Sequence, residues 1–252
     1  MTACDEIARG MATPEFHRDP YPLYARMRRE HPVYRSSGGV WYLTRYADVD
    51  AALRDPRLSK DQARMRRWSA RHTGAEDVAR LRERFGRSMP HADPPDHTRL
   101  RTLVSKMFAA RRMRDLRPRI EAIADGVLDD AVAAGRGSGI DVITALAHPL
   151  PITVICELVG VPLSDRDRIG AWSRQLVDQT EAVPAPEDLR RVERAADELE
   201  DSLRDLVRRR RADPTGDIVS ALVGAMDRGA PLTEDELLST CYLLIVAVTR
   251  RP

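Results

Sequence analysis

Apolar residues recur at helical spacing along most of the chain. Side chains three and four positions apart share one face of a helix, so such a stripe predicts a helix with one buried side. The segment 152–161 is apolar almost all round, which favours a fully buried helix, and Pro162 is predicted to end it. The stripes predict helices at 22–29, 46–55, 94–108, 116–128, 152–161, 169–177, 192–206, 218–226 and 237–248.

A short stretch near the N-terminus has the composition of a strand instead. Residues 40–44 read Val-Trp-Tyr-Leu-Thr, and β-branched and aromatic residues favour strands. Residues 32–34 are a candidate partner strand across a turn at 36–39. The fold class expected is mainly α with a small β-sheet near the N-terminus. Because no repeat or low-complexity linker divides the chain, we expect a single domain over 1–252.

Two helix starts carry recognisable capping residues. Asp93 precedes two prolines and is predicted to cap the helix that follows, since proline in a first turn sacrifices no hydrogen bond. Thr233 is followed three residues later by Glu236. That spacing predicts a capping box at the start of the last helix.

The charge balance gives no overall reason to expect nucleic acid as a partner. The chain has 41 basic and 39 acidic residues, a net charge of +2, and 42% hydrophobic residues. The run Arg208 to Arg211 is the one local argument for nucleic-acid binding, and it has no interleaved aromatic residues. We interpret it as the solvated end of a long helix, where cations suit the helix dipole, and expect no nucleic-acid partner.

The cysteines and the N-terminus indicate the cellular compartment of the protein. The three cysteines, Cys4, Cys156 and Cys241, are far apart and odd in number, which argues against a disulfide framework and for a reducing compartment. The first ten residues are interrupted by charges and show no signal peptide or membrane anchor. The sequence therefore predicts a cytoplasmic protein with no membrane association.

The candidate binding residues are His97 and Arg101. They are four positions apart on a predicted helix and so share a face. An arginine beside a histidine near a helix start makes a good clamp for a carboxylate. On spacing alone, a solvated polar face is the favoured interpretation of the pair.

The segment that contains this pair closely resembles the C helix of bacterial soluble cytochromes P450. It reads Asp-Pro-Pro-Asp-His-Thr-Arg-Leu-Arg at 93–101 and Leu-Val-Ser-Lys-Met-Phe at 103–108. Three more segments are similar to that family in the same order along the chain, so the resemblance covers essentially the whole sequence. They are the first sheet and B helix at 41–59, the E helix at 151–162, and the start of the I helix at 232–247.

This resemblance implies a haem-thiolate monooxygenase. Such an enzyme inserts one oxygen atom from O₂ into a small lipophilic organic substrate, with electrons from NAD(P)H that arrive through a ferredoxin. His97 and Arg101 match the family positions that bind the haem propionates. The loops at 60–92 and 172–187 correspond to segments that cover the substrate.

The same resemblance gives an expectation for the redox partner. In the family, the surface at the C helix faces an acidic ferredoxin. Arg99, Arg111 and Arg112 match that surface, and charge complementarity would suit them to docking. A merely solvated surface is the alternative.

The chain departs from the family at its last residues. The family's I helix continues Ala-Gly-His-Glu-Thr-Thr, whereas residues 247–252 read Ala-Val-Thr-Arg-Arg-Pro. Removing one base from a DNA spelling of Gly-His-Glu-Thr-Thr yields Val-Thr-Arg-Arg-Pro. We therefore hypothesise a frameshift that truncates the chain within the I helix. A gene sequence with no haem-binding segment in the shifted frame downstream would refute this.

The resemblance places the family's Glu-x-x-Arg pair and its cysteine-containing haem loop beyond the I helix. The expected structure is therefore an incomplete cytochrome P450 fold with no catalytic residue and no metal ligand assigned. Cys156 and Cys241 lie in apolar patterns typical of small buried residues. We expect this chain to be inactive; the alternative is a non-catalytic relative that activates a partner enzyme.

Truncation would also uncover the last helix. The family packs its I helix through the centre of the molecule, against elements from later in the chain. Five apolar residues are therefore expected to lose part of their cover, namely Leu237, Leu238, Leu243, Leu244 and Ile245.

Overall fold

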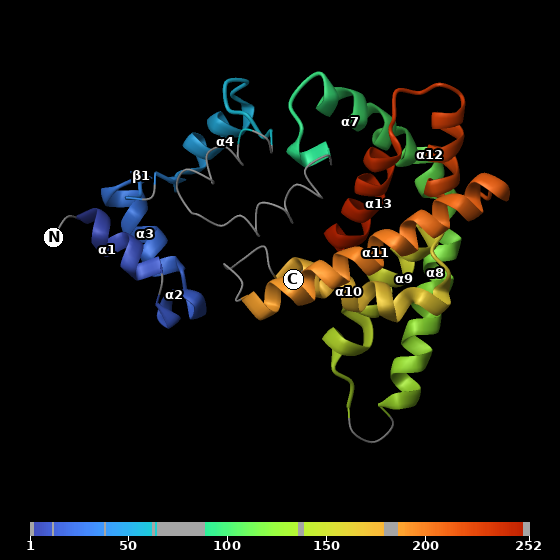
Figure 1. The fold of residues 1–252 in the computed structure, drawn as a ribbon. Coiled ribbons are helices and arrows are strands. Elements are labelled where there is room, and N and C mark those ends of the chain that lie inside the picture. Colours follow the sequence, from blue (N-terminus) through green and yellow to red (C-terminus); the bar gives the residue numbers. More distant parts are fainter. Residues whose placement is uncertain are drawn as a thin grey trace. The chain divides into compact units, whose positions relative to one another are not determined.

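The structure is a computed structural model, and it describes residues 3–11, 13–37, 39–61, 64, 89–135, 139–178 and 186–248. The described residues are mainly helical, with one small sheet (Figure 1). The chain divides into two compact units, Met1–Ala79 and Arg80–Pro252. The single domain expected over 1–252 stays a prediction.

The first unit combines short helices with a β-hairpin. Strands β1 (Val33–Arg35) and β2 (Trp41–Leu43) pair antiparallel, with Tyr34 opposite Tyr42. Gly39 takes a φ of 80° in the connecting turn, a conformation that glycine adopts without steric cost. The two predicted strands and the predicted helix at 22–29 are confirmed. The helices of this unit are α1 (Ala3–Met11), α2 (Pro14–Arg18), α3 (Tyr21–Glu30) and α4 (Tyr46–Arg54).

A small apolar cluster holds this unit together. Ile7, Met27 and Tyr34 are buried, so α1, α3 and β1 meet at one point. Ile7 and Met27 are fully buried. The hairpin and the helices therefore share one core.

The second unit is a helical core. The helices predicted from apolar stripes all form, with ends that differ by a few residues. They are α7 (Asp96–Met107), α8 (Ala110–Ala134), α9 (Pro149–Val159), α10 (Arg166–Asp178), α11 (Pro186–Ala212), α12 (Ile218–Asp227) and α13 (Glu234–Val248), with the short turns η1 (Met89–His91), η2 (Ile143–Ala147) and η3 (Leu163–Asp165).

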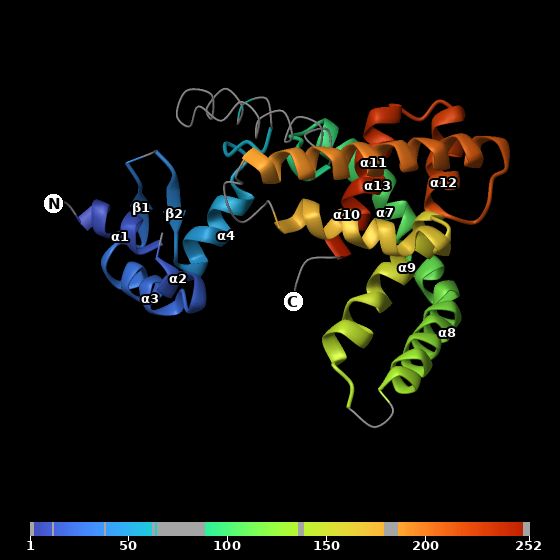
Figure 2. The same ribbon diagram turned by 60° about the horizontal axis from the view of Figure 1, so that its bottom comes forward.

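Helices α9 and α13 lie at the centre of this core. Helix α13 packs against α9, α10 and α11, and α10 runs alongside α11 in both ribbon views (Figures 1 and 2). The predicted stripe of α11 is its buried face. Its members are no more than 2% exposed, and they are Val192, Ala196, Leu199, Leu203 and Leu206.

The expected loss of cover on α13 is wrong for its main apolar side chains. Leu237 and Ile245 are fully buried and Leu238 is 5% exposed. Helices α9, α10 and α11 already cover these side chains. Leu243 and Leu244 are half-buried.

Helix α9 ends earlier than predicted. Gly160 takes a φ of 95°, and the N–H groups of Gly160 and Val161 both donate to the carbonyl of Cys156. A glycine in the left-handed conformation is a common helix stop. Gly160 therefore ends the helix after Val159, before Pro162 is reached.

The arginine run at the end of α11 is not simply solvated. Arg210 pairs with Asp217 and donates to the Gly160 carbonyl at 2.9 Å. Asp217 also accepts from the Ser220 N–H at 2.7 Å, which caps α12. The expected solvated face is thus wrong for Arg210, because this guanidinium joins the ends of α9, α11 and α12.

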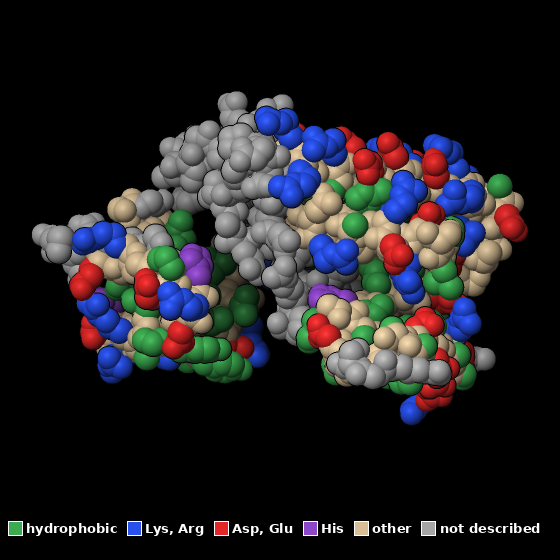
Figure 3. Space-filling view, turned by 90° about the horizontal axis from the view of Figure 1, so that it is seen from below, with side chains coloured by type: hydrophobic (Ala, Val, Ile, Leu, Met, Phe, Trp, Pro, Cys, Tyr) green, Lys and Arg blue, Asp and Glu red, His purple; other side chains and the backbone are tan. Residues whose placement is uncertain are grey.

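Charges of both signs intermingle on the surface of the second unit. On the face drawn in Figure 3, basic and acidic side chains alternate. Arg208 pairs with Asp205, and Arg211 lies 3.8 Å from Asp227. Two arginines of the run are thus paired with acidic side chains on the surface.

We expect Asp217→Asn to lower the free energy of unfolding by about 3 kcal/mol. The side chain of Asp217 is only 6% exposed, and asparagine keeps the cap but removes the charge that Arg210 faces. Urea unfolding measures the loss. Asp201→Asn is the control, because Asp201 is 77% exposed and should change stability by less than about 0.5 kcal/mol. Equal losses in the two variants would contradict this account.

Candidate functional site

Helix α7 presents a buried side and a polar side. Leu100 and Met107 are buried in the core of the second unit. His97 is half-buried and Arg101 is exposed, one turn apart. Both residues lie on α7, and their spacing of four places them on the same face of this helix.

An open groove of about 500 Å³ lies along this polar side. The side chains of His97 and Arg101 make no hydrogen bond or ion pair with any other described residue. Both are therefore free to bind a ligand, and Arg101 is a permanent cation that suits a carboxylate. The lining residues are His97, Thr98, Arg101, Thr102, Ser105 and Lys106.

The start of α7 differs from the expectation. The helix begins at Asp96 after a cis bond between Pro94 and Pro95, and no side chain caps it. The predicted cap by Asp93 is wrong, because the N-cap position falls on Pro95, which has no side-chain oxygen. Asp93 instead accepts from the His97 N–H through its backbone carbonyl, at 3.0 Å.

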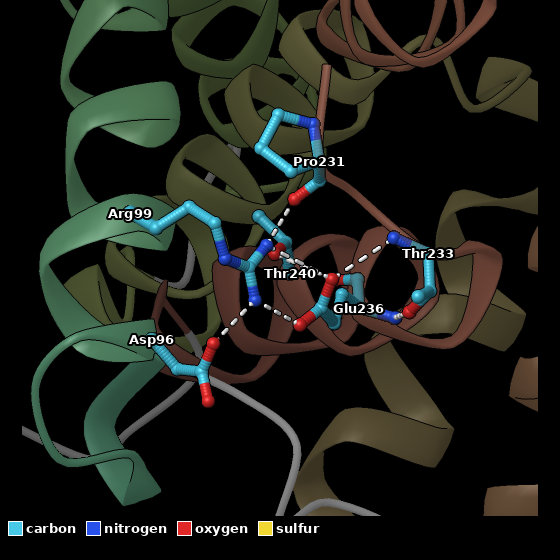
Figure 4. Close-up of polar contacts among 6 residues, drawn as sticks. All are labelled: Asp96, Arg99, Pro231, Thr233, Glu236 and Thr240. Atoms are coloured by element: carbon cyan, nitrogen blue, oxygen red, sulfur yellow. Dashed lines mark hydrogen bonds and ion pairs between the residues drawn. The ribbon is translucent and has the colours of Figure 1, made fainter. Parts of the chain in front are cut away.

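Arg99 is turned into the protein, where it joins α7 to α13 (Figure 4). Its guanidinium donates to Glu236 Oε1 at 2.5 Å and to Oε2 at 3.2 Å. It also contacts Asp96 at 2.9 Å and the Pro231 carbonyl. The expected docking surface is thus wrong for Arg99, whereas the side chains of Arg111 and Arg112 lie outside those described.

Glu236 is the fixed end of this cluster. Its carboxylate accepts from the Thr233 N–H at 2.9 Å, and its own N–H donates to Thr233 Oγ1 at 3.2 Å. The predicted capping box is therefore confirmed. The glutamate's second role, as the partner of Arg99, was not predicted, because 137 residues separate the two in the chain.

The pKa of Glu236 reflects two opposing effects. Burial raises it, but the hydrogen bonds from Arg99 and from the Thr233 backbone outweigh that effect and hold the pKa below its usual value. The carboxylate therefore stays ionised near neutral pH, and the pair with Arg99 persists there.

The two described cysteine side chains do not form a metal site. Cys156 and Cys241 are free and buried. Burial raises the pKa of each thiol to about 12, so neither presents a thiolate at neutral pH. The side chain of Cys4 lies outside those described.

Three expectations fall partly or wholly outside the described residues. Two of them concern the loops expected to cover the substrate, because most of 60–92 and residues 179–185 are not described. So are residues 249–252, on which the frameshift hypothesis rests. Within the described part of the chain, no helix is both long and apolar enough to cross a membrane.

Comparison with known proteins gives the class that this chain resembles. Over the residues matched, the chain is similar in sequence and in fold to the bacterial cytochromes P450. No family model matches the chain.

Particular relatives support this assignment. The chain is 42% identical to vitamin D(3) 25-hydroxylase of Pseudonocardia autotrophica over 92% of its own length and 54% of that protein's. It is 39% identical to 6-deoxyerythronolide B hydroxylase of Saccharopolyspora erythraea, over 92% and 57% respectively. The structure of Mycobacterium smegmatis CYP164A2 superposes with a TM-score of 0.79 at 33% identity, over 97% of this chain and 60% of that one. The chain thus spans little more than half the length of these relatives.

We expect acid to destabilise this protein partly through Glu236. A carboxyl with a lowered folded-state pKa stabilises the fold above its unfolded-state pKa, here 4.5, and that stability is lost as pH falls through the folded-state value. Thermal melts at several pH values measure it. Glu236→Gln should have a lower melting temperature than the wild type at neutral pH. The difference between the two melting temperatures should become smaller in acid. A difference that stays constant below pH 4.5 would contradict this assignment.

Proposed function

We propose that the activity to which this chain contributes is haem-dependent monooxygenation. The reaction inserts one oxygen atom of O₂ into a small lipophilic organic substrate, while the other leaves as water. Electrons come from NAD(P)H through a ferredoxin in the cytoplasm. The observation that carries the proposal is the free His97–Arg101 pair on α7, within the sequence and fold of the cytochromes P450.

The residues on α7 fit the propionate end of haem. Propionates are carboxylates, and Arg101 supplies a guanidinium fork, the group best shaped to bind them. His97 adds a second donor one turn away. The start of α7 adds the positive end of a helix dipole. In our proposal these two side chains orient the cofactor, and the cofactor, when bound, supplies the oxygen chemistry.

The buried thiols do not fit the iron end of the cofactor. A cytochrome P450 needs a thiolate that donates electron density to the iron. Cys156 and Cys241 are buried and protonated. We therefore propose that His97 and Arg101 bind cofactor, and that neither Cys156 nor Cys241 supplies the thiolate that turnover needs.

The relatives' names support a lipophilic substrate. One is a hydroxylase of vitamin D(3) and another a hydroxylase of 6-deoxyerythronolide B. The class of substrate is therefore proposed, without a particular compound.

We expect Arg101→Ala to weaken haem uptake about tenfold, because one charge-assisted contact to a propionate is lost. A spectrophotometric haem titration measures this, and His97→Ala should have a smaller effect. Arg117→Ala on α8 is the control, since Arg117 is 80% exposed and away from the groove. The assignment fails if wild-type protein takes up no haem or if Arg101→Ala binds haem equally well.

We expect the reduced haem-loaded protein to show no thiolate-type Soret band with carbon monoxide. The physical reason is that both described thiols are buried within the apolar core. A thiolate-type band would show that a cysteine does ligate iron. Separate Cys4→Ala, Cys156→Ala and Cys241→Ala variants would then identify it.

A further inference from the structure

We infer that Arg99 is a positioning residue that sets the rotation of α7 and thereby aims His97 and Arg101 at their ligand. Its partner in this role is Glu236, at the start of α13. The inference rests on the proposed function, since it concerns the same carboxylate-binding face. It assigns to Arg99 a task other than contact with the ligand.

The geometry of a helix makes Arg99 suitable for this task. An α-helix turns by about 100° per residue, so Arg99, two residues from each, points roughly 160° around α7 from both His97 and Arg101. A side chain held on one side of the helix therefore fixes what the opposite side presents. Arg99 is held there by a two-pronged bond to Glu236 and is only 25% exposed.

The other attachments of α7 do not supply the same constraint. Leu100 and Met107 bury α7 against the core. Their burial decides which side of α7 faces the core. The bonds from Arg99 have defined directions, because a guanidinium fork matches a carboxylate in one plane. Arg99 therefore adds a directional restraint on the rotation of α7 to the one that its apolar contacts supply.

The anchor on α13 is itself immobilised. The Glu236 side chain is 14% exposed and also accepts from the Thr233 N–H. Its backbone carbonyl accepts from Thr240 Oγ1 at 2.7 Å. Figure 4 shows these groups converging from the start of α13 and the segment before it. Through Arg99, the position of the buried helix α13 thus determines the orientation of the exposed side of α7.

Two variants isolate this role. Arg99→Lys keeps the charge but replaces the fork with a single ammonium. Glu236→Gln keeps a residue that completes a capping box but removes the charge that Arg99 faces. Arg101→Ala is the control for direct ligand contact. Arg117→Lys is the control for an exposed pair, because Arg117 bonds Glu121 at 2.8 Å on the surface of α8.

Two measurements are made on each full-length variant: amide hydrogen exchange, resolved by peptide, and haem titration. We expect Arg99→Lys and Glu236→Gln each to speed exchange in 96–107 about tenfold, with α11 unchanged, and to weaken haem uptake about tenfold. Arg101→Ala should weaken uptake without changing exchange. Arg117→Lys should change neither quantity.

The outcomes separate the inference from the proposed function. If Arg101→Ala weakens haem uptake while Arg99→Lys and Glu236→Gln bind as the wild type does, the positioning role is overturned and the proposed site stands. Unchanged exchange in 96–107 in both variants also overturns it. If the wild type takes up no haem, or Arg101→Ala binds normally, the proposed function fails. The inference then fails with it, whatever the exchange rates show.

Discussion

The burial of α13 among α9, α10 and α11 is the constraint on which the candidate site depends. Leu237, Cys241 and Ile245 are fully buried, and their burial fixes the helix against its neighbours. Glu236 lies next to Leu237, so the same packing fixes the carboxylate that binds Arg99. The orientation of His97 and Arg101 is thus traced back, through one ion pair, to an apolar core.

The two partly buried arginine–carboxylate pairs show how this chain uses its many arginines. Arg99 bonds Glu236 and Arg210 bonds Asp217, and each carboxylate also accepts from backbone at the start of a helix. The pair of Arg99 and Glu236 joins helices far apart in the chain, whereas the pair of Arg210 and Asp217 joins consecutive helices. Both carboxylates also satisfy donors that a helix start leaves unpaired. A charge buried in this way is costly to strip of its partner. These contacts hold the ends of helices that apolar packing alone would leave free to shift.

The propionates and the iron of a haem would meet different chemical groups in this protein. His97 and Arg101 are free cationic or polar donors on one face of α7, which is what propionates need. Cys156 and Cys241 lie within the apolar core, where burial keeps them as thiols. The described residues are therefore suited to the carboxylates of the cofactor and unsuited to its iron.

The sequence by itself determined the helices, the hairpin, the capping box and the shared face of His97 and Arg101, because each follows from residues within a few positions of one another. It did not determine where Arg99 and Arg210 point. Only the tertiary structure decided this, because Glu236 and the Gly160 carbonyl, to which the two arginines donate, come from distant parts of the chain. The stop of α9 at Gly160 is a local feature, and the sequence interpretation missed it in favour of Pro162. Arg99 looks like a solvated surface residue until α13 brings Glu236 beside it. The period of the apolar residues indicates which side of a helix is buried. Which element covers that side depends on how all the helices pack together.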